Sequence, residues 1–307
     1  MTLRLMVTGA TGQVASALLE ESQGNDSLVV ICLGRDKLDI TDAERVMAAV
    51  RQHDPHIIVN AAAYTAVDRA ESEPSLAKAV NEEGAYHLAR AAVDRNIPLI
   101  HLSTDYVFNG RKTTPYREDD ATEPLSVYGR TKLAGEQAIG QAGARHIILR
   151  TAWVFSHNGL NFVRTMLRLG SERDVVRVVG DQHGNPTYAT SIARVIFAVA
   201  QRLHADAGNE SLYGIFHMAG QGSVSWYDFA RAIFEECAAY EKRSPAVEEI
   251  TTAQYPTAAI RPANSRLDCD KLASVYDIVL PHWRDDLKVC IQRMLTQDVS
   301  KVEPAHG

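Results

Sequence analysis

The sequence predicts an α/β protein with a doubly wound parallel sheet and a smaller lobe in its C-terminal half. The chain begins with a short apolar run, a glycine-rich loop and a helical pattern. This alternation of apolar runs and helical patterns continues to about residue 155, as in sheets whose parallel strands are joined by helices. A later apolar run ends in hydroxyl side chains and precedes a helical pattern with a Tyr-x-x-x-Lys spacing. Together these observations indicate a Rossmann-like fold.

The first predicted strand, residues 3–8, runs into a loop that reads GATG and then into a helix. Gly9 allows a tight turn, Gly12 lets the backbone approach a phosphate, and Ala15 lets the helix pack closely on the strand. A helix N-terminus after such a loop suits a pyrophosphate, although small residues at this spacing also occur for packing alone. The residues expected to contact a dinucleotide here are Gly9, Thr11, Gly12, Gln13 and Val14.

The second predicted strand, residues 28–33, is followed closely by Arg35. Sites for NAD usually place an acidic residue at this point, where it binds the ribose. A guanidinium instead suits the additional phosphate of NADP, so Arg35 favours NADPH. NADH stays open, because an arginine here is also typical of a solvated loop and because Asp36 or Asp39 could bind a ribose. The expected cofactor contacts of this segment are Arg35, Asp39 and Ile40.

The third predicted strand, residues 57–60, leads into three consecutive alanines. Side chains this small at the carboxyl end of a strand let the backbone lie against a flat ligand, and tight packing explains them equally well. Helices are predicted at residues 42–52 and 74–95, the second from its apolar stripe. The alanines expected to contact the cofactor are Ala61, Ala62 and Ala63.

The fourth predicted strand, residues 97–102, ends in a polar cluster at the sheet edge where ligands of open α/β sheets bind. In the next helix, residues 128–140, Tyr128 and Lys132 share one face. We expect the ammonium to lower the pKa of the phenol from its usual value of about 10. A hydroxyl such as Thr104 beside a Tyr-x-x-x-Lys helix is a proton-relay arrangement for reducing or oxidising a carbonyl. The cluster comprises Ser103, Thr104, Asp105 and Tyr106.

A fifth predicted strand, residues 146–149, completes a unit that we expect to bind the dinucleotide mainly through residues 1–155. Residues 156–307 mainly form a smaller substrate-binding lobe, in which the alternation of strands and helices loosens. A strand and a helix at about residues 175–203 are expected to return to the first unit. Trp153, just past the fifth strand, is either a lid over a flat or sugar-like group or part of the core.

The amino-acid composition gives no sign of nucleic-acid, membrane or zinc binding. The 307 residues have a formal net charge of −6 and a pI near 6.0, so there is no electrostatic reason to expect nucleic-acid binding. No apolar run is long enough to span a bilayer and no signal peptide precedes the first strand, so we expect a cytoplasmic protein with no membrane partner. The four cysteines are scattered and form no C-x-x-C, which indicates neither zinc nor disulfides.

Five stretches carry a family resemblance that runs along nearly the whole chain: TGATGQVA, STDYVF, YGRTKLAGE, DQHGNPT and RPANSRL. They resemble the extended short-chain dehydrogenase/reductase superfamily and, within it, the dTDP-4-dehydrorhamnose reductase family. The resemblance implies NADPH-dependent reduction of the C4 keto group of dTDP-4-dehydro-L-rhamnose to dTDP-L-rhamnose. It also implies that Tyr128 gives a proton to the C4 oxygen, that Lys132 holds the cofactor ribose, and that Thr104 orients the keto oxygen.

The same resemblance implies a nucleotide-sugar partner. Related 4,6-dehydratases carry Thr-Asp-Glu where this chain has Thr104-Asp105-Tyr106, so the elimination of water lacks its base. Some reductases of the family hold a metal between subunits through a glutamate, but the corresponding residue is Ala17, so we expect no metal and leave a homodimer open. The candidates for binding the sugar are Thr104, Asp105, Tyr106 and Trp153, and Arg261 is the candidate for the phosphates of the nucleotide.

Two other functions stay open on the sequence alone. The first is a non-catalytic NADP-binding regulatory subunit that resembles the partner of methionine adenosyltransferase and also retains Tyr-x-x-x-Lys. Trp153 and the RPANSRL stretch favour the enzyme, because both are placed for a sugar nucleotide. The second is a reductase of another 4-keto-sugar nucleotide, or an epimerase.

Overall fold

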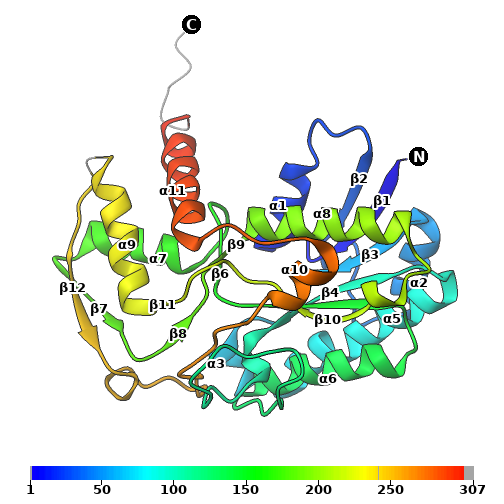
Figure 1. Ribbon diagram of the computed structural model, residues 1–307, viewed down its shortest axis with the longest axis horizontal. Coiled ribbons are helices and arrows are strands. Elements are labelled where there is room, and N and C mark those ends of the chain that lie inside the picture. The colour runs from blue at the N-terminus through cyan, green and yellow to red at the C-terminus, as the bar shows by residue number, and fades with distance from the viewer. Residues whose placement is uncertain (1, 241, 301–307) are drawn as a thin grey trace, which may run out of the picture.

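Six parallel strands form the main sheet of the computed structural model (Figure 1). They are β1 (Leu3–Thr8), β2 (Leu28–Leu33), β3 (Ile57–Asn60), β4 (Leu99–Thr104), β5 (His146–Thr151) and β10 (Gly214–His217). The structure describes residues 2–240 and 242–300, with side chains through residue 296. The first three strands begin and end where the sequence predicts, while β4 is shifted by two residues toward its polar end.

The order of the strands, β10-β5-β4-β3-β1-β2, places a topological switch point between β1 and β3. The chain lays β2 on one side of β1 and then crosses over to lay β3, β4 and β5 on the other side. In open α/β sheets the crevice at the carboxyl ends of two such strands is where ligands bind. The predicted Rossmann-like, doubly wound sheet is confirmed, and the loops after β1 and β3 form its crevice.

Helices cover both faces of this sheet (Figure 1). Successive residues of β1 point to opposite faces: Leu5 and Val7 share a core with Leu18, while Met6 shares another core with Leu88. Burial on both faces explains why these strands are nearly continuous apolar runs. One face carries α1 (Gln13–Glu21) and α8 (Ala189–Ala205), and the other carries α2 (Ala43–His53), α5 (Gly84–Arg95) and α6 (Val127–Gln141).

The helix predicted over residues 74–95 is interrupted, so that prediction was partly wrong. It consists of α4 (Pro74–Lys78), a π-helical turn η1 (Ala79–Glu83) and α5. The π turn places Asn81, whose side chain accepts from the backbone N–H of Tyr64 at 2.8 Å and donates to the Thr131 hydroxyl at 3.0 Å. Such turns often lie at functional sites, and this one ties the loop after β3 to α6.

The smaller lobe combines helices with two-stranded sheets around an aromatic core that includes Phe155, Phe229 and Trp283. Figure 1 shows it beside the main sheet, with α11 projecting from it. Its helices are α7 (Phe162–Glu172), α9 (Trp226–Ala238) and α11 (Trp283–Ser300). Its sheets pair β6 (Val154–Phe155) with β9 (Thr187–Tyr188), β7 (Val175–Val179) with β12 (Ala246–Ile250), and β8 (His183–Gly184) with β11 (Val224–Ser225).

The strand predicted to return to the first unit does not do so, which corrects the expected domain organisation. β7 pairs with β12 in the smaller lobe, and β10 instead pairs with β5 at the edge of the main sheet. Along β7 only Val176 and Val178 are buried, and this alternation suits a sheet with one face in solvent rather than a strand covered on both faces. The helix of that segment does return, because α8 packs against α1. The predicted limits at residues 1 and 307 lie outside the described residues.

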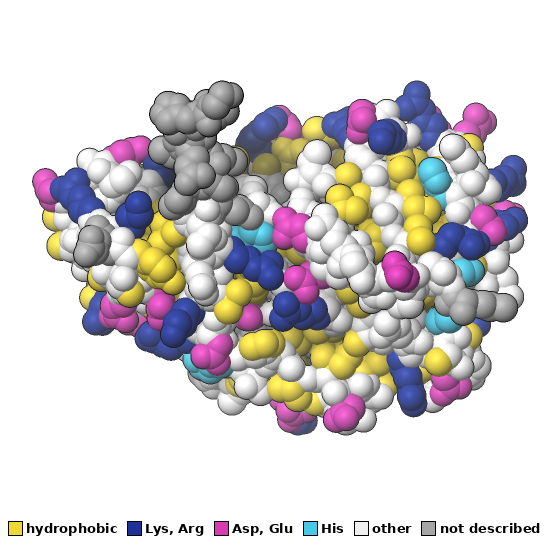
Figure 2. Space-filling view, turned by 90° about the horizontal axis from the view of Figure 1, so that it is seen from above, with side chains coloured by type: hydrophobic (Ala, Val, Ile, Leu, Met, Phe, Trp, Pro, Cys, Tyr) yellow, Lys and Arg dark blue, Asp and Glu magenta, His cyan; other side chains and the backbone are white. Residues whose placement is uncertain are grey.

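The surface carries charges of both signs. On the face in Figure 2, lysines and arginines are interspersed with aspartates and glutamates. Within the described part of the chain, no helix combines the length and apolar character needed to cross a bilayer. The remaining short elements are α3 (Val67–Ala70), α10 (Asp270–Tyr276) and the 3-10 turns η2 (Asp105–Val107), η3 (Glu210–Leu212) and η4 (Thr252–Gln254).

Candidate active site

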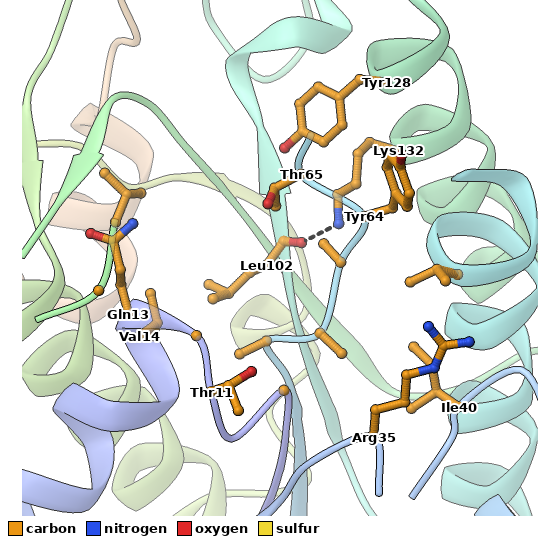
Figure 3. A pocket seen from close by; sticks show the side chains of 18 of the residues that line it. Thr11, Gln13, Val14, Arg35, Ile40, Tyr64, Thr65, Leu102, Tyr128 and Lys132 are labelled. Atoms are coloured by element: carbon orange, nitrogen blue, oxygen red, sulfur yellow. Dashed lines mark hydrogen bonds between the residues drawn. The ribbon is translucent and has the colours of Figure 1, made fainter. Parts of the chain in front are cut away.

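A cavity of about 700 Å³ lies at the carboxyl edge of the sheet and extends from the loops after β1, β2 and β3 to α6. Figure 3 shows Tyr128 at the top of the view, Arg35 and Ile40 at the lower right, and Gln13 at the left. All of the residues predicted to contact the cofactor line this one cavity. They are Gly9, Thr11, Gly12, Gln13, Val14, Arg35, Asp39, Ile40, Ala61, Ala62, Ala63, Tyr128 and Lys132.

The glycine loop fits an anionic group. Gly9 has a φ of +77°, and a Cβ there would lie 2.9 Å from the carbonyl oxygen of Ala61 and from backbone atoms of Ala62, so the two crevice loops can meet only at a glycine. α1 begins at Gln13 directly after Gly12, with no side-chain cap on its first amides. These amides line the cavity with the positive end of the helix dipole, as a pyrophosphate requires.

The far end of the cavity carries one exposed guanidinium. Arg35 Nε donates to Asp39 at 3.3 Å, and 74% of the arginine side chain remains exposed. The hydroxyl and the backbone N–H of Thr41 donate to the same carboxylate, and these hydrogen bonds, helped by Arg35, hold the Asp39 pKa below its usual value. Asp39 therefore anchors the arginine while leaving its other nitrogens free for a phosphate.

Helix α6 brings Tyr128 against the polar end of β4. Ser126 caps the helix by accepting from the Gly129 N–H at 3.1 Å. A Cβ on Gly129 would lie 2.2 Å from the carbonyl oxygen of Tyr106, so only a glycine lets α6 approach η2 this closely. The rings of Tyr106 and Tyr128 then meet edge to face, 5.5 Å apart. Tyr128 thereby joins the hydroxyl cluster with Thr104, as the sequence predicts.

The expected effect of Lys132 on Tyr128 is not found in this structure. Burial raises the pKa of Tyr128 to about 12, and the nearby Thr104 hydroxyl offsets only part of that rise. The reason is the position of the ammonium: Lys132 Nζ donates to the carbonyl oxygen of Leu102 at 2.6 Å and lies 3.2 Å from His101 Nε2. Burial lowers the pKa of Lys132 to about 8, with Glu136 opposing that shift.

Thr104 and Asp105 form a pair at the start of η2. The Thr104 hydroxyl accepts from the backbone N–H of Tyr106 at 3.2 Å and lies 3.0 Å from Asp105 Oδ1. Both side chains are buried, and Asp105 Oδ2 has no hydrogen-bond partner among the described residues. Burial raises the pKa of Asp105 to about 7, with the Thr104 hydroxyl working against that rise.

The other sugar candidates lie around this pair and outside the 700 Å³ cavity. Trp153 has a φ of +48°, which is strained for a bulky residue, and such strain persists where the surroundings enforce it. Its ring stacks on Trp226 at 3.5 Å, and its Nε1 donates to Ser265 at 3.1 Å. Arg261, the candidate for the nucleotide phosphates, forms a two-bond ion pair with Asp68 at 2.9 and 3.1 Å.

Comparisons with known proteins decide the family. Residues 3–296 match the family model described as the RmlD substrate binding domain. A dTDP-4-dehydrorhamnose reductase from Sinorhizobium fredii is 46% identical over 96% of this chain and 99% of its own length. The chain belongs to this reductase family. The resemblance inferred from the sequence is therefore confirmed.

Solved structures of the family share the whole architecture. A dTDP-4-dehydrorhamnose reductase from Clostridium acetobutylicum superposes with a TM-score of 0.89 at 34% identity, covering 95% of this chain and 100% of that one. The same enzyme from Bacillus anthracis, solved in complex with NADP, gives a TM-score of 0.88 at 35% identity with the same coverage. Both lobes therefore belong to the family fold.

A chain of polar side chains behind Lys132 belongs to none of the motifs recognised in the sequence. His101 Nε2 lies 3.2 Å from Lys132 Nζ, and His101 Nδ1 lies 2.9 Å from the side-chain nitrogen of Asn60, which accepts from Thr8 through its oxygen. All four side chains are buried, and burial lowers the His101 pKa well below its usual value. A histidine inside an otherwise apolar strand pattern was the available signal.

A buried ion pair beneath the same helix was also missed. Glu136, one turn after Lys132 on α6, accepts from Arg150 Nε at 3.0 Å and Nη2 at 2.7 Å, and from the Ser103 hydroxyl. Only 3% of each charged side chain is exposed. The pair joins α6 to β5 and, through Ser103, to β4. The local sequence offers little sign of it, because a glutamate and an arginine are normally placed at the surface.

Proposed function

We propose that the chain reduces the C4 keto group of dTDP-4-dehydro-L-rhamnose with NADPH and forms dTDP-L-rhamnose. The observation that carries the proposal is the position of Tyr128 and Lys132 at one end of a dinucleotide-sized cavity, opposite Arg35 and beside Thr104. The names of the family members, and the NADP bound to the Bacillus anthracis enzyme, support the same reaction.

Tyr128, Lys132 and Thr104 each have a separate role in the proposed reduction. When bound, NADPH supplies the hydride. Tyr128 stays protonated at neutral pH because burial raises its pKa, so it carries the proton that the C4 oxygen needs. Lys132, with a pKa of about 8, keeps a positive charge at neutral pH and lines the cavity beside Tyr128, where it holds the ribose of the cofactor. Thr104 hydrogen-bonds the C4 oxygen, and that contact strengthens as negative charge develops.

The substrate contacts belong to the same proposal. Tyr106 and Trp153 present aromatic surface near the hydroxyl cluster, which suits a deoxysugar. Arg261 binds the nucleotide phosphates by exchanging its contacts with Asp68 for phosphate oxygens. Asp105 is buried and reaches the sugar through Thr104. We also propose that the chain acts in the cytoplasm, and sedimentation velocity would measure whether it forms the homodimer that the resemblance leaves open.

The test is a turnover assay on the purified chain. We expect NADPH absorbance to fall only when dTDP-4-dehydro-L-rhamnose is present, with dTDP-L-rhamnose as the product by mass spectrometry and NMR. NADPH binding without oxidation would contradict the proposal and support a regulatory subunit. Oxidation with a different 4-keto-sugar nucleotide, but not with this one, would assign the other reductase activity.

Replacing Arg35 tests the cofactor preference. We expect Arg35→Ala to lower kcat/KM for NADPH by about 10- to 100-fold, the range for losing a charge-assisted hydrogen bond to phosphate. The value for NADH, which lacks that phosphate, should change by less than about threefold. Arg168 is the matched control, because it is also exposed and paired four residues away on its own helix, at Glu172. Equal losses with both cofactors would refute a 2′-phosphate contact.

A further inference from the structure

The Thr104 hydroxyl can donate only one hydrogen bond, and two neighbours could accept it: Asp105 and a bound substrate. One lone pair already accepts from the backbone N–H of Tyr106. The second lone pair and the proton remain. One of them is directed at Asp105 Oδ1, 3.0 Å away, and the other is directed toward Tyr128, where the substrate's keto oxygen would bind. The direction of the Thr104–Asp105 hydrogen bond therefore decides what Thr104 can offer a substrate.

The two states of Asp105 have opposite consequences. An ionised carboxylate only accepts hydrogen bonds, so it takes the Thr104 proton and leaves Thr104 with a lone pair toward the C4 oxygen. That arrangement repels the negative charge that develops during reduction. A carboxylic acid instead donates its proton to the Thr104 oxygen. Thr104 is then free to donate its own proton to the substrate.

The surroundings of Asp105 favour its protonated, carboxylic acid form. Asp105 is 3% exposed, its Oδ2 has no hydrogen-bond partner, and no ion pair among the described residues includes it. An ionised carboxylate in such a place would be compensated only by the neutral donors around it, the Thr104 and Ser265 hydroxyls and the amides of Asp105 and Tyr106, and by no opposite charge, which does not offset its burial. Burial accordingly raises the pKa of Asp105 to about 7. The nearby Ser265 hydroxyl is already engaged, since it accepts from Trp153 and lies 3.3 Å from the carbonyl oxygen of His183.

We propose that Asp105 is a positioning residue that works as a carboxylic acid: it donates to the Thr104 oxygen and so turns the Thr104 proton toward the substrate's keto oxygen. The inference rests on the proposed reduction and adds a residue that acts through Thr104. It also gives the buried carboxyl a function that direct contact with the sugar does not supply.

The groups that face Asp105 leave it as the main titrating group near neutral pH. Tyr106, on η2 itself, and Tyr128, on α6, both stay protonated because burial raises their pKa values. Beyond Tyr106, Arg261 and Asp68 are charges that pair with each other, and their pKa values move away from neutrality. Lys132, further along α6, titrates above Asp105 because its pKa is about 8.

The test compares the pH dependence of kcat/KM for the keto sugar in the wild type and in Asp105→Asn. We expect the wild-type value to fall by about tenfold between about pH 6 and pH 8, because an acid with a pKa of about 7 becomes a carboxylate over that range and Thr104 loses its donor role. Asparagine has the shape of the acid and does not ionise. Its profile should lack this step and keep only the decline above about pH 8 that both proteins share through Lys132.

Two further measurements separate this role from a purely structural one. In a Thr104→Val background, Asp105→Asn should change kcat/KM by less than about twofold at every pH, because the hydroxyl through which it acts is gone. The melting temperature of Asp105→Asn minus that of the wild type should grow as pH rises from about 4 to 7 and then level off. In that range only the wild type loses stability, because its unfolded chain releases the Asp105 proton while the folded protein, in which burial raises the pKa to about 7, keeps it.

The outcomes are distinct. A step near pH 7 that persists in Asp105→Asn, or a loss of activity by the same factor at every pH, overturns the proposal. A melting difference that does not change with pH also overturns it, and this readout needs no turnover. Absence of NADPH oxidation at every pH would instead refute the proposed reduction, while the melting series would still report whether Asp105 is an acid at neutral pH.

Discussion

Tyr128→Phe is expected to lower kcat for the keto sugar by at least about a hundredfold, the range for losing a general acid. The variant keeps the aromatic ring at the end of the cavity and removes only the hydroxyl. NADPH should therefore still bind, because the glycine loop and Arg35 are untouched. Stopped-flow measurement of NADPH oxidation in a single turnover would show that the loss lies in the chemical step.

A matched control keeps this experiment specific. Tyr86 is an exposed tyrosine on α5, away from the cavity, so Tyr86→Phe should leave turnover within about twofold of the wild type. If Tyr128→Phe retains more than about a tenth of the wild-type kcat, the proton comes from another group. Solvent reaching the C4 oxygen would then be the first alternative to examine.

The second large effect is on stability. Replacing Glu136 with alanine should lower the free energy of unfolding by about 3–5 kcal/mol, because it leaves the buried Arg150 guanidinium without its counter-charge. Urea unfolding followed by far-ultraviolet circular dichroism would measure the loss, after refolding has been shown to be reversible. The effect is large because the pair joins α6, β5 and β4 at once.

The chain contains a matched control for burial. Arg168 and Glu172 form a similar two-bond pair on α7, but both side chains are at least half exposed. Glu172→Ala should change stability by less than about 1 kcal/mol. A double variant with methionine at both Glu136 and Arg150 should recover part of the Glu136→Ala loss, since neither charge then remains buried alone. Equal effects at the two glutamates would contradict this account.

Most of the cofactor cavity could be predicted from the sequence because its signals are local. A strand, a glycine loop and a helix N-terminus follow one another within Leu3–Thr8 and Gln13–Glu21, so their relative placement is set by short-range geometry. The same holds for Tyr128 and Lys132, which one helix presents on one face. Every residue predicted for the cofactor accordingly lines one cavity.

The features that could not be predicted depend on contacts between distant segments. Lys132 turns to Leu102 and His101 because β4 passes behind α6, and no pattern within the helix indicates that. The π turn places Asn81 where its side chain hydrogen-bonds Tyr64 and Thr131, which lie in other parts of the chain. The partner of β7 was misjudged for the same reason: an apolar strand looks alike in either sheet, and its alternating burial becomes visible only after folding.

Strand β10 lies far along the sequence from the other strands of the main sheet, and this affects how the sheet is completed during synthesis. The main sheet is complete only when the chain has passed from Thr151, the end of β5, through most of the smaller lobe to Gly214, where β10 begins. Until then β5 is an open edge, with backbone groups able to pair with another chain. The interval makes the last pairing a long-range contact, a kind that forms more slowly than a local one and leaves the edge of β5 uncovered until it forms. A fragment ending near residue 155 would keep that edge permanently, so the dinucleotide-binding part is not separable where the sequence divides most naturally.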